Sequence, residues 1–420
     1  MEKVCIYTFG CKINIFDSEV IKDKFSNEGY EIVKKWQDAD IIVVNSCTVT
    51  HKADNKFYDF VKKVKRDNPT AKVVALGCLT ELEPESVLRT GNIDLLLGSS
   101  DKFEVVERIR SGKLNIVNRN ETEPIFYDYH INNFHHHTRA FLKIQDGCDN
   151  YCTYCTIPKA RGKSRSKSLS SILEDIRSLS ENDYKEIIIS GIDLGSYRDG
   201  NLKLSDAIEE ILKIDGFRLR VSSVEPWCFD KKLIDLILNN NRICPHFHIP
   251  LQNASDAILK KMGRKYRIYD FNSLIEKLAL RENIMISTDM ITGFPGESEE
   301  DFKQNLNYLR DSKITYAHIF SYSDRPRAAS KNLPYKIPAP VIKSRSEELH
   351  RVSTEKKAKF YDLMIDKTFE IIGENSKKIS GYTENYLPVK ISNTIKIEQN
   401  KIYRIKIDGY FDDICTGIIV

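Results

Sequence analysis

The sequence contains no apolar run close to the roughly 20 residues that a membrane-spanning helix needs. It also lacks the pattern of a secretory signal peptide, because Met-Glu-Lys leads directly into a short apolar strand pattern. The net charge is only +4 over 420 residues, which is far from the strongly basic balance that would by itself indicate nucleic-acid binding. We therefore expect a cytoplasmic protein with no membrane partner.

Ten cysteines without an export signal indicate a reducing compartment, where thiols serve metals or catalysis. Three of them, Cys148, Cys152 and Cys155, have the spacing C-x3-C-x2-C, in a loop directly after the apolar run 141–144. No fourth cysteine lies nearby, so the pattern fits neither a closed zinc site nor a ferredoxin-type cluster. It predicts a [4Fe–4S] cluster with one open iron, at which a substrate or cosubstrate can bind.

Three further cysteines follow strands of a predicted parallel sheet. Apolar strand patterns alternate with helical periodicity through residues 1–112, which predicts a doubly wound α/β domain. No glycine-rich phosphate motif follows the first strand. Instead Cys11, Cys47 and Cys78 follow three successive strands, at the edge where such sheets bind ligands. They predict a second open [4Fe–4S] site, with three unrelated buried cysteines as the alternative.

The rest of the chain shows two further sequence patterns. Six strand patterns separated by helical patterns, between residues 140 and 321, predict a partial (β/α)6 barrel that resembles a TIM barrel and has its active site at the carboxyl ends of the strands. Residues 367–420 alternate apolar and polar positions, which predicts a small antiparallel β-barrel. The expected divisions are a first domain 1–112, a linker 113–133, the large barrel 134–366 and the small barrel 367–420.

Two features left alternatives open. Cations occupy every second position from 159 to 167, either as a solvated loop or as a strip that faces nucleic-acid phosphates. Tyrosines in the small barrel suit either base stacking or a β-sheet core. The residues concerned are Lys159, Arg161, Lys163, Arg165 and Lys167, and Tyr382, Tyr386, Tyr403 and Tyr410.

The cysteine loop at 148–155 resembles that of the radical S-adenosylmethionine enzymes. With three dispersed cysteines before it and a small β-barrel after it, the chain resembles the methylthiotransferase family over nearly its whole length. The segments 8–14 (Thr-Phe-Gly-Cys-Lys-Ile-Asn), 45–50 (Asn-Ser-Cys-Thr-Val-Thr) and 157–166 are similar to the MtaB branch. The small barrel resembles a TRAM domain, an RNA-binding module. The chain departs from the family pattern at Glu81, where Gln is common, and at Arg327, where Gly is usual.

This resemblance implies an enzyme that transfers a methylthio group to C2 of N6-threonylcarbamoyladenosine at position 37 of tRNA, beside the anticodon. It implies two S-adenosylmethionine molecules and a radical, since the hydrogen on C2 is too weakly acidic for a side-chain base. The catalytic cluster is implied on Cys148, Cys152 and Cys155. An auxiliary cluster, whose open iron can hold a sulfur atom, is implied on Cys11, Cys47 and Cys78. The sequence does not distinguish sulfur from this cluster from sulfur of an added sulfide. Gly191, Glu225 and Gln252 are candidate contacts to S-adenosylmethionine. We expect a monomer that needs an unidentified electron donor.

Two kinds of alternative stay open. Within the family, the substrate could be N6-isopentenyladenosine in tRNA or an aspartate of a ribosomal protein. Outside it, the chain could be a non-catalytic iron–sulfur electron carrier or a zinc-binding RNA module.

Overall fold

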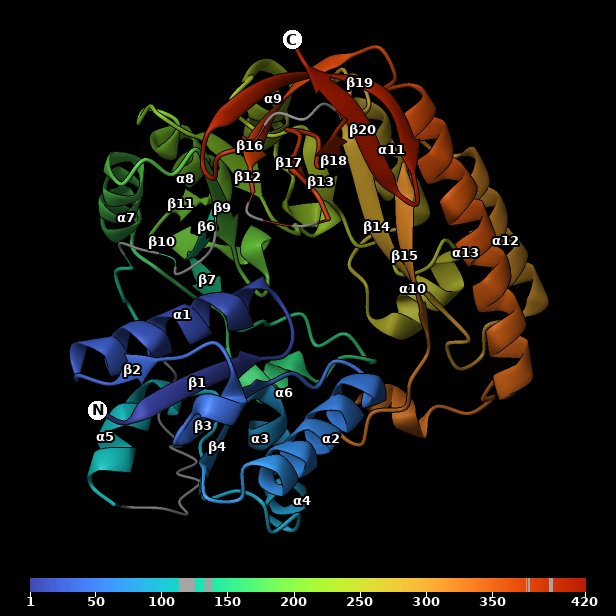
Figure 1. The fold of residues 1–420 in the computed structure, drawn as a ribbon. Coiled ribbons are helices and arrows are strands. Elements are labelled where there is room, and N and C mark those ends of the chain that lie inside the picture. The colour runs from blue at the N-terminus through green and yellow to red at the C-terminus, as the bar shows by residue number, and fades with distance from the viewer. Residues whose placement is uncertain (113–124, 132–133, 135–137, 375, 377, 393–395) are drawn as a thin grey trace. The chain divides into compact units, whose positions relative to one another are not determined.

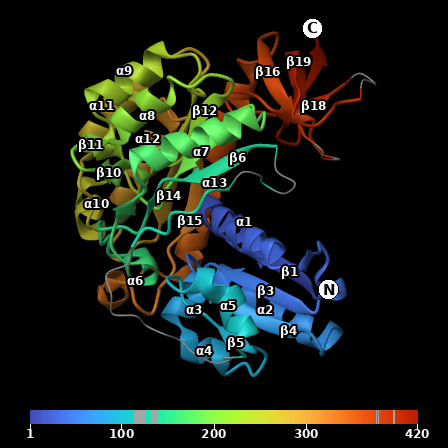
Figure 2. The same ribbon diagram turned by 90° about the vertical axis from the view of Figure 1, so that its left-hand side faces the viewer.

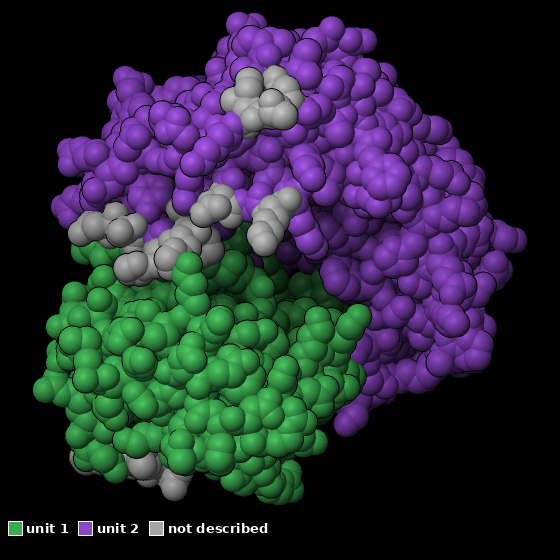
Figure 3. Space-filling model, viewed as in Figure 1, with its two compact units in different colours: residues 1–131, 145–167, 325–328 green, residues 132–144, 168–324, 329–420 purple. Residues whose placement is uncertain are grey.

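The computed structural model describes residues 1–112, 125–131, 134, 138–374, 376, 378–392 and 396–420. Parts of the predicted linker, 113–124 and 132–133, therefore lie outside the described residues. The chain divides into two compact units, which Figure 3 colours separately. Unit 1 comprises Met1–Ile131, Gln145–Lys167 and Arg325–Ala328, and unit 2 comprises Asn132–Ile144, Ser168–Asp324 and Ala329–Val420. The domain limits expected from the sequence remain a prediction.

Unit 1 is built on a five-stranded parallel sheet with the order β2-β1-β3-β4-β5. Its strands are β1 (Lys3–Thr8), β2 (Glu31–Ile32), β3 (Ile41–Ser46), β4 (Lys72–Gly77) and β5 (Leu95–Leu96). All of β3 is buried, as expected for a β-branched strand with helices on both faces. Helices α1 (Lys12–Asn27) and α2 (His51–Asp67) cover opposite faces of the sheet (Figure 1). The predicted doubly wound domain is confirmed.

Unit 2 contains six parallel strands in two three-stranded sheets, β12-β9-β6 and β13-β14-β15. A bridge between Leu219 and Ile243 continues the first sheet towards the second. The strands are β6 (Ala140–Lys143), β9 (Glu186–Ser190), β12 (Arg218–Val221), β13 (His246–His248), β14 (Met285–Thr292) and β15 (Tyr316–Ser321). This arrangement confirms the predicted partial barrel.

Helices alternate with these strands and surround them (Figure 2). They are α7 (Leu169–Glu181), α8 (Leu204–Ile211), α9 (Lys231–Asn239), α10 (Asp256–Met262), α11 (Ile268–Leu278), α12 (Glu299–Asp311) and α13 (Ala339–Asp362). Ser168, Asp230 and Ser298 cap α7, α9 and α12 by accepting a hydrogen bond from the first turn. The short α10 was not predicted. Within the described chain, every helix is too short or too polar to span a bilayer.

The C-terminal strands close into a barrel with the order β16-β17-β18-β20-β19. They are β16 (Thr368–Gly373), β17 (Gly381–Tyr382), β18 (Pro388–Ile391), β19 (Ile402–Phe411) and β20 (Ile414–Ile419). The predicted small barrel is confirmed, but it is not wholly antiparallel, because β18 and β20 pair in parallel. A closed ring with an odd number of strands cannot alternate direction throughout, so at least one neighbouring pair must be parallel.

Hydrogen bonds and ring contacts join the small barrel to side chains of β9 and β12. Glu186 is fully buried and accepts from Arg220 Nε at 2.7 Å, and Arg220 Nη1 donates to the carbonyl oxygen of Glu384 at 3.0 Å. Tyr382 and Tyr386 stack on each other with ring centroids 4.7 Å apart. The guanidinium of Arg139 lies over both rings. These two tyrosines therefore serve the attachment of the barrel.

Candidate iron–sulfur centres

The C-x3-C-x2-C loop lies in unit 1, between β7 (Gln145–Asp146) and α6 (Ile157–Arg161). β7 pairs with β8 (Arg165–Ser166), and the N–H of Cys148 donates to the carbonyl oxygen of Gly162 at 3.1 Å. Gly147 has a φ of +73°, and a Cβ there would lie 2.0 Å from the carbonyl oxygen of Lys163. Only glycine fits this close approach, which folds the loop back on its own base.

The sulfur atoms of Cys148 and Cys155 in this loop accept backbone hydrogen bonds. The N–H of Asn150 lies 3.5 Å from Cys148 Sγ, and the N–H of Ile157 lies 3.4 Å from Cys155 Sγ. Cys152, between them, is only 8% exposed. Hydrogen bonds to sulfur and low solvent exposure are the features by which a protein tunes an iron–sulfur cluster. The loop therefore fits the cluster predicted for it.

The other three cysteines lie at the carboxyl ends of adjacent strands of the parallel sheet. Cys11 is the N-cap of α1, Cys47 directly follows β3, and Cys78 directly follows β4 as the first residue of α3 (Cys78–Leu82). A Cβ at Gly10, which has a φ of +112°, would lie 2.8 Å from Cys47 Cβ. Burial raises the pKa of Cys47 to about 12, and negative charge on Cys78 and Cys11 contributes to the rise. The three thiols thus share one neighbourhood.

Neither set of three cysteines is arranged to bind a single metal ion. Within the described residues, no group of three His, Cys, Asp or Glu side chains is placed to hold a single metal ion. A [4Fe–4S] cluster is wider than one ion and each cysteine binds a different iron, so its ligands stand further apart. An all-thiolate donor set also favours an iron–sulfur cluster over the cations that prefer oxygen. That these six residues hold two clusters remains a prediction.

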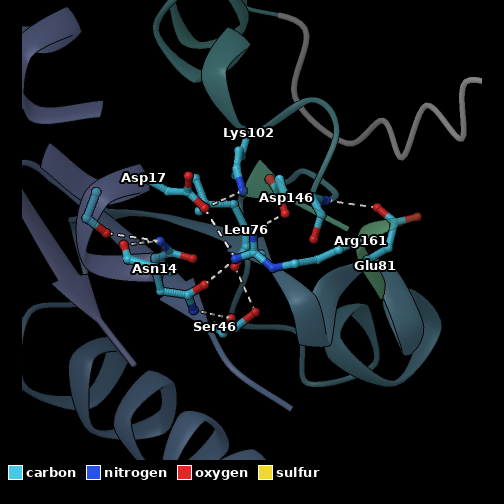
Figure 4. A network of polar contacts seen from close by, with 12 residues as sticks. Asn14, Asp17, Ser46, Leu76, Glu81, Lys102, Asp146 and Arg161 are labelled. Atoms are coloured by element: carbon cyan, nitrogen blue, oxygen red, sulfur yellow. Dashed lines mark hydrogen bonds and ion pairs between the residues drawn. The ribbon is translucent and has the colours of Figure 1, made fainter. Parts of the chain in front are cut away.

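A chain of buried polar contacts connects the three segments that carry Cys11, Cys47 and Cys78 (Figure 4). Asn14 Nδ2 donates to the carbonyl oxygen of Ser46 at 3.0 Å, and Ser46 Oγ donates to the carbonyl oxygen of Leu76 at 2.7 Å. Ser46 Oγ also accepts from the N–H of Leu79 at 3.1 Å. Hydrogen bonds therefore join the Cys47 segment, through Ser46, to the segments that carry Cys11 and Cys78.

The five cations at alternate positions from 159 to 167 do not form one surface, either as a wholly solvated loop or as a strip. Lys159 and Lys163 are exposed, but Arg161 and Lys167 are buried, and Arg165 is half-buried. Position 161 ends α6, which packs its Ala160 against Cys78, so the side chain of Arg161 turns inward. An alternation of charge in the sequence could not reveal this turn.

The candidate contacts to S-adenosylmethionine follow three strands of unit 2. Gly191 comes after β9, Glu225 after β12 and Gln252 after β13, all at carboxyl ends. Glu225 forms an ion pair with Arg264. Burial raises the pKa of Glu225 and the Arg264 charge opposes this rise. Gln252 has a φ of +67° and bridges to β14. Their roles as ligand contacts remain predictions.

Arg325 is a residue that the sequence did not single out. Its Nη1 donates to Asp54 Oδ2 at 2.7 Å, and its Nη2 donates to Thr48 Oγ1 at 2.5 Å, beside Cys47. The side chain is 5% exposed. The partners are more than 270 positions apart in the sequence, so no local pattern could have indicated the contact.

Comparison with known proteins gives matches over most of the chain. Residues 3–98 match the model described as "Uncharacterized protein family UPF0004", and residues 142–309 match the radical SAM superfamily. The threonylcarbamoyladenosine tRNA methylthiotransferase MtaB of Aquifex aeolicus is 35% identical, over 92% of this chain and 96% of that protein. The tRNA-2-methylthio-N(6)-dimethylallyladenosine synthase of Thermodesulfovibrio yellowstonii is 33% identical, over 99% and 94%.

A solved structure has a similar fold. It is the radical S-adenosylmethionine methyltransferase TsrM of Kitasatospora setae, with a tryptophan substrate and a SAM analogue bound. The TM-score is 0.57 at 15% identity, over 76% of this chain and 73% of that one. At this identity the likeness shows the fold alone.

Proposed function

Because the chain belongs to the radical S-adenosylmethionine tRNA methylthiotransferase family, we propose that it transfers a methylthio group to C2 of N6-threonylcarbamoyladenosine at position 37 of tRNA. The observation that carries the reaction is the presence of two three-cysteine sets within one compact unit. Two such centres match a reaction that must deliver both a sulfur atom and a radical to one carbon. The Aquifex relative, whose name specifies threonylcarbamoyladenosine, supports the substrate.

The radical SAM match implies S-adenosylmethionine and one [4Fe–4S] cluster, which we assign to Cys148, Cys152 and Cys155. We assign a second cluster to Cys11, Cys47 and Cys78. When bound, the first cluster would supply the electron that cleaves S-adenosylmethionine to a 5′-deoxyadenosyl radical, and the second would hold the sulfur atom that is transferred. The backbone donors to Cys148 and Cys155 would stabilise charge on the first.

The remaining assignments follow from the same proposal. Gly191, Glu225 and Gln252, at carboxyl ends of barrel strands, would bind S-adenosylmethionine, where barrels of this kind place their ligands. The walls of the barrel would keep groups other than the substrate, from which the radical could take a hydrogen atom, away from it. We also propose a cytoplasmic monomer that receives electrons from a separate donor.

The substrate is tested by mass spectrometry of nucleosides from bulk tRNA of a deletion strain. The proposal expects loss of 2-methylthio-N6-threonylcarbamoyladenosine and its return on complementation. Persistence of that nucleoside together with loss of the isopentenyl form would instead assign the substrate of the Thermodesulfovibrio relative. If both persist, a tRNA substrate is refuted and the ribosomal protein becomes the target to analyse.

The two centres are tested by anaerobic metal analysis and by two cysteine variants. The full chain should hold about eight irons, and no stoichiometric zinc. Cys152→Ala should abolish cleavage of S-adenosylmethionine, whereas Cys47→Ala should retain cleavage and lose methylthio transfer. One zinc and no iron would establish the non-catalytic alternative, and normal product formation by Cys47→Ala would refute the second centre.

A further inference from the structure

Arg161 joins the two cysteine-bearing regions of unit 1. Its guanidinium is buried and leaves α6 a few residues after Cys155. Nη2 donates to Asn14 Oδ1 at 2.5 Å and lies 3.2 Å from Asp17 Oδ2, both on α1, which Cys11 caps. Nη1 donates to Asp146 Oδ1 at 3.1 Å, two residues before Cys148 (Figure 4). The side chain of Arg161 therefore links α1, which begins after Cys11, to the residues just before Cys148.

The acidic partners of Arg161 are shared with other cations. Asp17 also lies 2.5 Å from Lys102 Nζ, and Asp146 also lies 3.2 Å from Arg165 Nη2. Two carboxylates thus face three cations, so they do not serve to neutralise Arg161 alone. A positive charge that is this deeply buried favours additional negative charge nearby.

One nitrogen of Arg161 lacks a hydrogen-bond partner in the described part of the chain. Its Nε is buried, and no hydrogen-bond acceptor reaches it from the described residues. A buried N–H without an acceptor costs free energy, and folded proteins rarely leave one unpaired. The Nε of Arg165 is also buried without an acceptor among the described residues. What distinguishes Arg161 is its place directly after Ala160, which packs against Cys78, so its Nε–H is available to an acceptor bound at the auxiliary cysteines.

The auxiliary cysteines are within electrostatic reach of this guanidinium. Burial would lower the pKa of Arg161, but negative charge on Cys78, Asp146, Asp17 and Cys11 raises it well above its usual value. In the other direction, the charge of Arg161 acts to lower the pKa of Cys47. Cys78 also packs against Ala160, the residue before Arg161.

We infer that Arg161 is a positioning residue for the auxiliary cluster: its Nε–H donates to a sulfur of that cluster, and its charge stabilises the reduced form. The inference rests on the proposed function, which places a cluster on Cys11, Cys47 and Cys78. Reduction adds negative charge to the cluster. A neighbouring cation and an N–H donor to sulfur favour that form, so they raise the reduction potential.

The test measures the potential of the auxiliary cluster in the full-length chain. Cys148, Cys152 and Cys155 are all replaced by Ala, so that only the auxiliary cluster is loaded. Arg161→Met removes both the charge and the donor, and Arg161→Lys keeps the charge but removes Nε–H. Arg165→Gln is the matched control. Arg165 lies in the same loop, contacts the same Asp146 and also has a buried Nε without an acceptor among the described residues, but it does not follow the residue that packs against Cys78. The reduction is followed by electron paramagnetic resonance during a redox titration.

Arg161→Met should disfavour reduction at least tenfold, which corresponds to about 59 mV for one electron. Arg161→Lys should shift the potential in the same direction by a smaller amount, and Arg165→Gln should leave it unchanged. An unchanged potential in a folded, iron-loaded Arg161→Lys chain refutes the inference, even if Arg161→Met fails to fold. A triple-Ala chain that holds no iron refutes the auxiliary cluster as well, whereas iron with an unshifted potential refutes only the role of Arg161.

Discussion

Gly77 is the last residue of β4 and directly precedes Cys78, and its replacement by Ala should disrupt the auxiliary site. Its φ of +107° and ψ of −151° lie in a region that is almost exclusive to glycine. A Cβ there would also lie 2.7 Å from Asn45 Oδ1 and from the carbonyl oxygen of Ser46. The first atom belongs to a buried side chain and the second to the backbone of β3, so neither can move without disturbing the sheet.

The expected magnitude combines two costs. A non-glycine residue in a left-handed or glycine-only conformation costs about 1–3 kcal/mol, and the close contacts at Gly77 add to it. Gly29→Ala is the matched control, because Gly29 has a φ of +82° and a Cβ there would meet nothing within 4 Å. We expect Gly29→Ala to cost about 1–2 kcal/mol. Gly77→Ala should cost at least about 1.4 kcal/mol more, which is a tenfold difference in an opening equilibrium.

Hydrogen exchange of the peptides from β3 and β4 measures this opening locally, which a global unfolding curve of a chain with several domains does not. Exchange in Gly77→Ala should be at least about tenfold faster than in Gly29→Ala. Iron should fall from about eight to about four per chain, since the displaced residue adjoins Cys78. Equal exchange rates in the two variants, together with a full iron content, would show that the close contacts at Gly77 relax at little cost.

Two further predictions concern buried ion pairs. Burial alone would raise the pKa of Glu186, but Arg220 and Arg218 hold it well below its usual value. The stability from this pair should therefore be present above about pH 4.3 and be lost as the pH falls below it. Glu186→Gln should cost about 3–5 kcal/mol at neutral pH and remove part of that acid sensitivity in thermal unfolding, whereas an unchanged pH profile would contradict the assignment. Arg325→Met should loosen the Cys47 segment by breaking the contact to Asp54, so that iron falls by half while 5′-deoxyadenosine is still formed; full iron would contradict this.

Much of the architecture follows from local sequence patterns. The β-branched run 41–44 is typical of a strand buried on both faces of a parallel sheet, and the alternation after position 367 is typical of a small barrel. The spacing of Cys148, Cys152 and Cys155 is also local, because one short loop carries all three cysteines. The place of Cys11, Cys47 and Cys78 at strand ends followed from the rule that parallel strands end at one edge.

What the sequence alone determined is therefore the set of elements and the cysteines at their ends, because both depend on periodicity and spacing over a few residues. The tertiary structure decided which charges are buried. Arg161 and Arg325 belong with unit 1 because they contact α1 and α2 across 144 and 271 positions, respectively. The parallel pairing of β18 with β20 likewise depends on closure of the whole ring. Such contacts depend on how distant segments pack, and no local pattern of residue types records that packing.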